Sequence, residues 1–259
     1  MSFIEQLKAA KVYDLGQPYF AGMPRFPTHP PFLSSLTKGH GDIVLKNGAS
    51  SAAESIALGS HVGTHIDALC HFSCGGHFYG GASIASGMAD LGIATVAPIV
   101  RRGVLFDVAG FVGVEVLPHD FVVTPELLDA MNIVVKPGDV ALLRTGWGSL
   151  WRDNRKFITA GLCEQVVGPG PALAGARWLS SRGVFAAGSD TVAFEHFPSP
   201  LMEVHVHLLV ESGIHIIECL NLEELARDNV REFGFVASPM KIEGGTGAPV
   251  RPLAICDIS

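Results

Sequence analysis

Three histidines and one aspartate lie within eleven residues, in the stretch HVGTHIDALCH at 61–71. Two neutral imidazole nitrogens and a carboxylate are a common ligand set for a catalytic divalent ion, because they leave positions free for water and substrate. Such an ion lowers the pKa of water toward neutrality and makes hydroxide available. We therefore interpret His61, His65 and Asp67 as metal ligands and His71 as a residue that could move the proton.

The backbone must bend for these side chains to meet. On a helix Asp67 would point away from His65, and on a straight strand His61 and His65 would be about 13 Å apart. We expect instead a strand through SIALGSH, a sharp bend at Gly63 and a helix over THIDALCHF that starts at Thr64. A competing interpretation is that Asp67 merely caps that helix. The density of metal-type residues favours the metal site.

Other residues beside the cluster are weaker candidates. Cys70 and Cys74 could supply zinc thiolates, although nitrogen and oxygen ligands are already at hand. His77 lies in CGGHFYGG, a glycine-rich stretch that predicts a mobile rim and not a ligand. The five scattered cysteines are most simply reduced.

A second group of candidate ligands lies far downstream. An expected helix over 199–212 contains His205 and His207, and Glu218 is near the end of an apolar strand expected over 214–220. A carboxylate in so apolar a strand is costly to bury unless it is paired or bound to a metal. Open α/β sheets place ligands at the carboxyl ends of their strands. These residues could bind a second ion or complete the first; the alternative is a salt-bridged glutamate and a surface histidine.

Strands and helices alternate from about residue 100. Thr124 and Pro125 open one helix as its N-cap and its first residue. The strands are apolar on both faces, which predicts an α/β fold with parallel pairing in one domain, 1–259. The expected strands are 103–110, 139–145, 184–190 and 214–220, and the expected helices are 124–132, 171–182, 199–212 and 222–229.

The N-terminal third has a different character. MSFIEQLKAAKVYDLG has an amphipathic helical pattern. Five prolines within 16–32 exclude a helix there and predict turns or an extended arm, over about 1–35 in all. Such an arm lies across a partner subunit or lines its own pocket.

Composition excludes several classes of function. The formal charge is −7 and no Lys/Arg run is present, so we expect no nucleic-acid partner. No apolar run reaches the roughly 18 residues of a membrane span, and no signal peptide is evident, so we expect a cytoplasmic protein without a membrane partner. The G-x-S-x-G, Walker and H-E-x-x-H motifs are missing from the sequence, which disfavours serine-hydrolase, P-loop and common zinc-peptidase chemistry.

The motif that begins at His61 resembles a known family signature. It matches H-x-G-T-H-x-D-x-x-x-H of the metal-dependent cyclase family, which includes bacterial kynurenine formamidase and isatin hydrolase. GDVALLRTGW, GSDT, the segment 205–218 and SPMKIEGGTGAPVRPLAI resemble further blocks of that family in the same order. Together these blocks span most of the chain.

The resemblance implies a fold, a cofactor and an assembly. The fold would be a swivelling β/β/α-type α/β domain with a mixed sheet, in a homodimer or higher oligomer whose N-terminal arms cross. The cofactor would be Zn²⁺ or Mn²⁺, used to hydrolyse an amide bond. By carry-over, His61, His65 and Asp67 are ligands and His71 is the acid/base. Glu218 and His205 match the downstream pair, with His207 as the rival because the spacing to Glu218 is one residue longer than expected.

The substrate expectation comes from departures from the formamidase pattern. The usual proline after Asp-Ala is replaced by Leu69, and the arm with HPPF and HGD is unlike the formamidase arm. Both features favour hydrolysis of isatin, a cyclic aromatic amide, to isatinate. The alternatives are an arylformamidase acting on N-formylkynurenine and a non-catalytic metal- or ligand-binding protein. Aromatic residues expected to stack on the substrate are Phe20, Phe26, Phe32, Phe72 and Tyr79, with Tyr19 as a further candidate.

Overall fold

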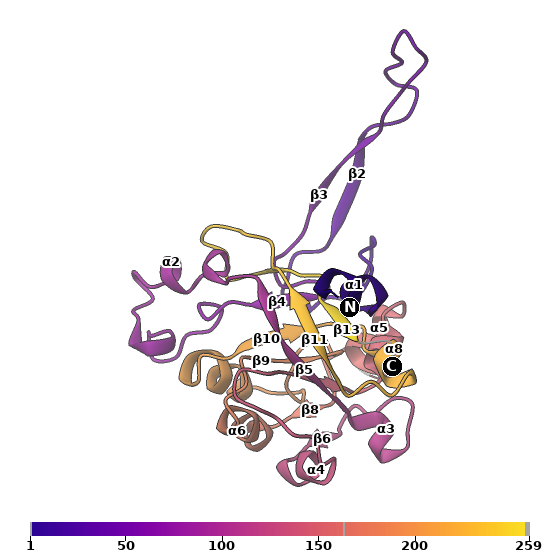
Figure 1. Cartoon of the computed structure of the whole chain (residues 1–259). Coiled ribbons are helices and arrows are strands. Elements are labelled where there is room, and N and C mark those ends of the chain that lie inside the picture. The colour runs from indigo at the N-terminus through magenta and orange to yellow at the C-terminus, as the bar shows by residue number, and fades with distance from the viewer. Residues whose placement is uncertain (1, 163, 257–259) are drawn as a thin grey trace.

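Nine strands form one mixed sheet in the computed structural model, which describes residues 2–162 and 164–256 (Figure 1). Their order across the sheet is β1-β13-β11-β5-β7-β9-β10-β4-β12. The strands of this sheet are β1 (Lys11–Asp14), β4 (His65–Asp67), β5 (Ile99–Asp107), β7 (Val140–Arg144), β9 (Ala186–Ser189), β10 (His215–Glu218), β11 (Glu232–Ala237), β12 (Gly247–Pro249) and β13 (Leu253–Cys256).

The four central strands are parallel, as the sequence predicted. β5 pairs with β7, β7 with β9, and β9 with β10, all in the parallel sense. β7 is buried along its whole length, which explains its continuous apolar sequence VALL. All the other pairs of this sheet are antiparallel within the described residues, so the sheet is mixed.

Helices cover one face of the parallel strands. Phe106 of β5 and Leu143 of β7 pack there with Trp178 and Leu208 from the helices. Thr124 caps α4 through its side chain, and Pro125 follows in the first turn, as predicted. The helices on this side are α4 (Pro125–Ala130), α6 (Leu173–Ser181) and the continuous pair α7 (Glu203–His205) and η4 (Val206–Glu211).

The opposite face is closed by the sheet itself. Its core contains Tyr13 of β1, Ile66 of β4 and Ala248 of β12 beside Leu142 of β7. Since β1 and β12 are the two ends of the strand order, the sheet curls so that both ends border one core. The remaining helical elements are α1 (Phe3–Ala9), α2 (Met88–Leu91), α3 (Val108–Val112), α5 (Asn154–Thr159), α8 (Glu223–Arg227), η1 (Tyr79–Gly81), η2 (Ile93–Thr95) and η3 (Trp147–Leu150).

One expected helix is wrong. The segment THIDALCHF does not form a helix from Thr64; its residues 65–67 form strand β4. β4 lies between β10 and β12 and pairs with both. Ile66 is fully buried on the core side, so hydrogen bonds and burial from distant segments determine the conformation of this short stretch.

Three other helix boundaries differ from expectation. The helix expected over 199–212 begins at Glu203, and its second part is a π-helix. The helix expected from Pro171 begins at Leu173, because the preceding short strand β8 (Gly170–Pro171) pairs with β6 (Val122–Val123). The N-terminal helical pattern ends at Ala9, and the rest of it continues as edge strand β1.

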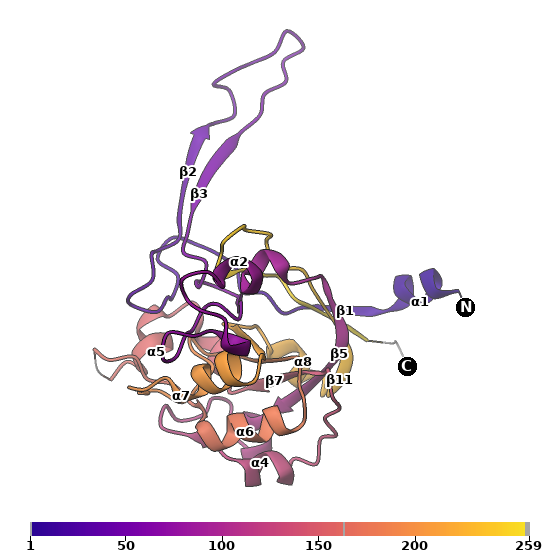
Figure 2. The same cartoon turned by 90° about the vertical axis from the view of Figure 1, so that its left-hand side faces the viewer.

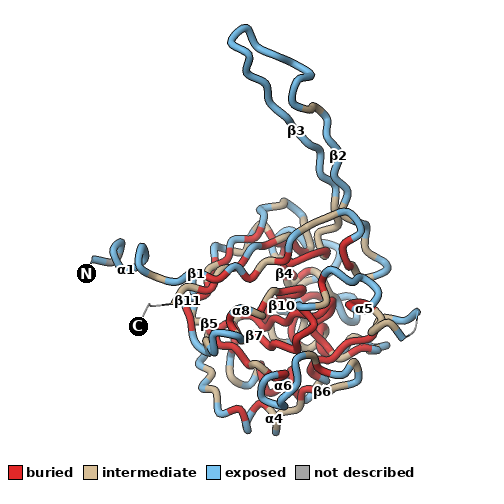
Figure 3. Tube along the Cα trace, turned by 90° about the vertical axis from the view of Figure 1, so that its right-hand side faces the viewer, coloured by how far each residue is buried: buried red, intermediate tan, exposed pale blue. Residues whose placement is uncertain are grey.

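A two-stranded hairpin projects far from the body (Figure 2). It consists of β2 (Leu33–Lys38) and β3 (Ala53–Ala57), and its residues are exposed almost throughout (Figure 3). The projecting segment therefore lies further along the chain than the arm expected over 1–35. Residues 16–32 form turns and extended backbone against the body, without a helix. No helix among residues 2–162 and 164–256 is long and apolar enough to cross a membrane.

Candidate metal centre

The bend expected at Gly63 is present and only glycine suits it. Gly63 has φ +65°, and a Cβ there would lie 2.1 Å from the Tyr19 ring. The Tyr19 hydroxyl donates to the carbonyl oxygens of Val62 (3.2 Å) and Thr64 (2.8 Å). The N-terminal segment thus holds the backbone on both sides of the bend.

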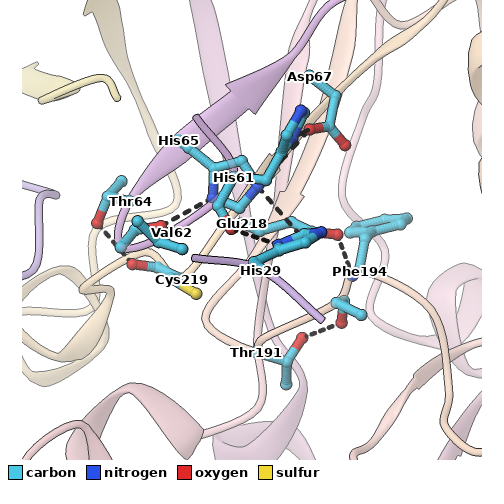
Figure 4. A network of polar contacts seen from close by, with 12 residues as sticks. His29, His61, Val62, Thr64, His65, Asp67, Thr191, Phe194, Glu218 and Cys219 are labelled. Atoms are coloured by element: carbon cyan, nitrogen blue, oxygen red, sulfur yellow. Dashed lines mark hydrogen bonds and ion pairs between the residues drawn. The ribbon is translucent and has the colours of Figure 1, made fainter. Parts of the chain in front are cut away.

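A second set of contacts anchors the same loop to the sheet. The Thr64 hydroxyl donates to the carbonyl oxygen of Cys219 (2.6 Å) and accepts from the backbone N–H of Gln17 (2.8 Å). Figure 4 shows Thr64 and Cys219 side by side below the strand that continues into His65. The loop at 61–64 is therefore hydrogen-bonded to Cys219, the residue that follows Glu218.

The first candidate ligand group consists of His61, His65 and Asp67. The Nδ1 atom of His61 lies 2.7 Å from Oδ1 of Asp67, and Nε2 of His65 lies 3.6 Å from the same oxygen. The other nitrogen of His65, Nδ1, bonds to the Gly63 carbonyl oxygen (2.8 Å), which turns Nε2 toward the carboxylates. One possible ligand atom from each of the three residues lies within 4.8 Å of the other two, so they could hold one ion.

The second candidate group consists of Asp67, His205 and Glu218, again with atoms within 4.8 Å of one another. Glu218 is opposite His65 in the β10–β4 register, and its Oε2 lies 3.4 Å from Nε2 of His65. Nε2 of His205 lies 3.2 Å from the other Glu218 oxygen and 4.0 Å from Oδ2 of Asp67. Asp67 therefore belongs to both groups.

The structure separates the two rival downstream histidines. His205 is buried in the site, whereas His207 bonds to Ser180 of α6 (2.8 Å) and to Glu211 (2.7 Å), away from the site. The π-helical turns of η4 begin directly after His205, and π-helical turns accommodate extra residues within a helix. The longer spacing between His205 and Glu218 is therefore compatible with both residues reaching one site.

Both carboxylates of the site are buried. Asp67 is 1% exposed and Glu218 is 5% exposed. Burial alone would raise both pKa values. The imidazoles of His71 and His61 hold the pKa of Asp67 well below its usual range, and hydrogen bonds with His205 and His65 lower the pKa of Glu218 to about 2. The site therefore holds two ionised carboxylates away from water.

The donor set fits a divalent cation. Oδ2 of Asp67 is buried and has no hydrogen-bond partner within the described part of the chain. A carboxylate oxygen in that state is costly unless a cation contacts it. Imidazole nitrogen and carboxylate oxygen are ligands suited to Zn²⁺ and Mn²⁺. The fit does not distinguish between these two metals.

His71 lies beside the first group but belongs to neither group. Its ring stacks on the His61 ring with centroids 3.8 Å apart. Burial lowers the pKa of His71 to about 4, so the ring is neutral near pH 7 and able to accept a proton. Burial would also lower the pKa of His205, but Glu195 and Glu218 raise it to about 10.

Among the aromatic residues predicted to bind substrate, only Phe72 contacts the site residues directly. Its ring centroid lies 5.0 Å from that of His71 and 4.9 Å from that of His205. Phe26 is one ring further out, because it contacts His29, which in turn contacts His61. The others pack elsewhere: Phe20 on Trp151, Phe32 on Tyr19, and Tyr79 against Gly213.

The weaker candidates lie outside the centre. Cys70 and Cys74 belong to neither ligand group of the described residues, so a thiolate site is not supported. Cys70 is buried and Cys74 is exposed. His77 is exposed and bonds through Nδ1 to the Gly75 carbonyl oxygen (2.9 Å).

Several residues that contact the site were not predicted from the sequence, among them His29, Thr246 and Glu195. Nδ1 of His29 bonds to the carbonyl oxygen of His61 (2.9 Å), and the Thr246 hydroxyl bonds to Nε2 of His61 (2.9 Å). The Glu195 carboxylate bonds to Nδ1 of His205 (2.5 Å). His29 lies in HPPF and Thr246 in the block 238–255, but neither stretch has the spacing of a metal-binding motif. Each of the three residues acts on a partner that the fold brings near.

Comparison with known proteins agrees with this fold. The chain matches the Cyclase family model, described as "Putative cyclase", over residues 13–196, and it belongs to that family. The family assignment made from the motif at 61–71 is thereby confirmed. The matched region includes the first ligand group, Phe194 and Glu195 but ends before His205.

Two curated relatives are hydrolytic enzymes. Isatin hydrolase of Roseibium aggregatum is 27% identical over 208 residues, which cover 77% of this chain and 73% of the relative. Kynurenine formamidase of Bordetella petrii is 23% identical over 243 residues, which cover 94% of this chain and 97% of the relative.

Solved structures share the fold. The crystal structure of a novel cyclase aligns with a TM-score of 0.84 and 27% identity, over 97% of this chain and 88% of that one. An isatin hydrolase bound to the product analogue thioisatinate aligns with a TM-score of 0.79 and 21% identity, over 99% of this chain and all of that one. The expected α/β class with a mixed sheet is confirmed.

Proposed function

We propose that this chain is a metal-dependent hydrolase that opens a small cyclic aromatic amide, with isatin as the first candidate substrate. The observation that carries the proposal is the buried, unpartnered oxygen of Asp67, shared by two sets of possible ligands. The similarity to isatin hydrolase and the leucine at position 69 support the choice of substrate.

Each site residue has a defined part in this proposal. His61, His65 and Asp67 hold one divalent ion, and Asp67, His205 and Glu218 hold a second. When bound, the metal supplies a polarised carbonyl oxygen and a water of lowered pKa. His71, stacked beside His61, takes a proton from the attacking water and returns it to the departing nitrogen. Phe72 provides a ring face beside His71 for the aromatic substrate.

The second candidate substrate is N-formylkynurenine. Alignment with kynurenine formamidase extends over nearly the whole of both chains, further than the alignment with isatin hydrolase. Purified protein assayed side by side on both compounds distinguishes them, and we expect the higher kcat/KM on isatin. The reverse order would favour the formamidase, and cleavage of neither would overturn the substrate proposal.

The metal proposal has an independent test. Protein purified without chelator should contain Zn²⁺ or Mn²⁺ by elemental analysis, and His71→Ala should abolish turnover while metal content stays close to that of the wild type. Loss of metal from this variant would make His71 a ligand. Unchanged turnover would remove it from the mechanism. Retained metal with lost turnover would also argue against the non-catalytic alternative.

We further propose that the hairpin pairs two copies of the chain. A two-stranded ribbon is marginally stable alone, yet β2 and its loop expose Leu36 (71%) and Ile43, Val44 and Leu45 (60% each) in the single chain. Light scattering should give the mass of a dimer or higher oligomer, and Leu36→Asp should lower it. Leu201→Asp, at an equally exposed leucine away from the hairpin, is the control. A monomeric wild type would contradict the proposal.

A cytoplasmic location stays a prediction.

A further inference from the structure

The loop after β9 contains a buried carboxylate that the proposed reaction does not use. Glu195 is 2% exposed, and no arginine or lysine is among its hydrogen-bond partners in the described residues. Its Oε1 accepts from Nδ1 of His205 (2.5 Å) and from the backbone N–H of His205 (3.2 Å). Its Oε2 accepts from the Ser199 hydroxyl. The two hydrogen bonds from His205 to Glu195 fix the position of His205 and the orientation of its imidazole ring.

These bonds decide which ring nitrogen of His205 faces the centre. With Nδ1 donating to Glu195, Nε2 points to Glu218 (3.2 Å) and to the unpartnered oxygen of Asp67 (4.0 Å). A rotated ring would leave the Glu195 carboxylate buried without this partner, which is unfavourable. Glu195 therefore keeps a proton on Nδ1 of His205, so that Nε2 is the nitrogen left to bind a metal.

The preceding residue fixes the other member of the downstream pair. The backbone N–H of Phe194 donates to Oε1 of Glu218 (2.7 Å), as Figure 4 shows. Two consecutive loop residues thus hold Glu218 and His205, which come from different elements. Glu195 itself belongs to neither ligand group, since its oxygens are engaged with His205 and Ser199.

The charges point to the same role. Three buried carboxylates, those of Asp67, Glu195 and Glu218, surround the single imidazole of His205. Buried carboxylates are costly unless they are paired or bound to a metal. A cation on the side of Asp67 and Glu218 would offset part of this cost, while Glu195 stays bound to the far nitrogen of His205.

We propose that Glu195 is a positioning residue that orients His205 as a ligand of the second ion. The proposal rests on the proposed metal centre, but the orientation of His205 can be measured without metal. Glu195 acts only through His205, so the ion held by His61, His65 and Asp67 should be little affected by its loss.

The test uses the full-length protein and three variants. Glu195→Ala removes the acceptor, Glu195→Gln keeps an oxygen that can accept from Nδ1, and Glu211→Gln alters the same kind of carboxylate–Nδ1 pair at His207, outside the site. Long-range ¹H–¹⁵N NMR of the metal-free protein reports whether the Nδ1 proton of His205 is hydrogen-bonded to Glu195. Calorimetric titration with Zn²⁺ and with Mn²⁺ reports the affinities.

We expect a hydrogen-bonded Nδ1 proton on wild-type His205 and loss of this hydrogen bond in Glu195→Ala. The ion held by Asp67, His205 and Glu218 should lose about 10- to 100-fold in affinity in Glu195→Ala, as for other outer partners of ligating histidines, and less in Glu195→Gln. The ion held by His61, His65 and Asp67, and both affinities in Glu211→Gln, should change less than about twofold.

Two results would overturn the inference. One is an unchanged Nδ1 proton signal of His205 together with unchanged affinities in Glu195→Ala. The other is an equal loss of both ions in a folded Glu195→Gln, which would mean a structural effect on the whole centre. If Glu195→Ala fails to fold, the Nδ1 proton signal and the affinities of Glu195→Gln decide. A wild type that binds neither metal would refute the proposed function, whereas the NMR result would still test the role of Glu195.

Discussion

The strand β4 and the hairpin formed by β2 and β3 are neighbours in sequence but opposite in character. β4 is three residues long, yet it pairs on both sides and is buried throughout. Each hairpin strand is longer but pairs only with the other, and both are exposed. Strand length is therefore a poor guide to stability here. The number of neighbours decides which of the two segments can hold reactive side chains in place.

The sharpest test of this contrast is a pair of aspartates. Asp67→Asn should remove a shared ligand and reduce Zn²⁺ and Mn²⁺ affinity by more than the roughly 100-fold typical of an outer partner. Asp42→Asn, which alters only a turn bond to the Gly39 N–H (2.6 Å), should leave metal content unchanged. Titration calorimetry and elemental analysis measure both. Equal affinities would show that Asp67 binds no metal.

A pair of glycines tests the packing. Gly63→Ala combines a positive φ with a clash against Tyr19 and should lower the free energy of unfolding by about 3 kcal/mol or more. Gly41→Ala also has a positive φ, but nothing lies within 4 Å, so about 1 kcal/mol is expected. Urea denaturation measures both values. Similar costs would mean that Tyr19 moves aside freely.

A pair of isoleucines gives a smaller effect. Ile66→Val removes one methylene from a fully buried side chain and should cost about 1 kcal/mol. Ile56→Val, where 55% of the residue is exposed, should cost less than about 0.5 kcal/mol in the single chain. Denaturation at two protein concentrations checks this. A cost at position 56 that appears only at high concentration would place that residue in an interface between copies.

The smallest effect concerns the base of the N-terminal segment. Arg251 donates to Asp14 (2.6 Å) and holds the pKa of that largely exposed carboxyl below its usual range. A lowered folded-state pKa stabilises above the unfolded pKa, and the effect fades as the pH falls. Arg251→Gln should therefore destabilise the protein slightly at pH 7, and the effect should fade as the pH falls through the lowered pKa of Asp14. Added salt should reduce the difference in stability between the wild type and Arg251→Gln. A larger loss of stability at low pH than at pH 7 would contradict this prediction.

The sequence predicted the parts whose structure is determined locally. Thr124 and Pro125 start α4 where the capping rules place it, and the apolar run VALL forms β7. The ligand set and the bend at Gly63 were visible because they are close in sequence. β4 was mistaken for a helix because its conformation depends on β10 and β12, about 150 and 180 residues away.

The residues that hold the candidate ligands in place could not be predicted either, because their contacts also depend on the folded chain. Glu195 and Thr246 touch the candidate ligands only after the chain has folded, and neither lies in a metal-binding pattern. The choice between His205 and His207 needed the helix geometry after position 205. The projecting hairpin was not predicted: proline density marks the turns at 16–32, whereas the exposed, largely polar β2 sequence LSSLTK gives no strong strand signal.

The two bonds from the Tyr19 hydroxyl to the backbone around Gly63 have a thermodynamic consequence. These bonds couple the conformational ordering of residues 16–32 to that of the loop that carries His61 and His65. Any such coupling is reciprocal: if docking of residues 16–32 tightens ion binding, then ion binding must retain that segment by the same factor. Saturating the centre should therefore slow amide exchange and protease cleavage in a stretch that holds no ligand at all.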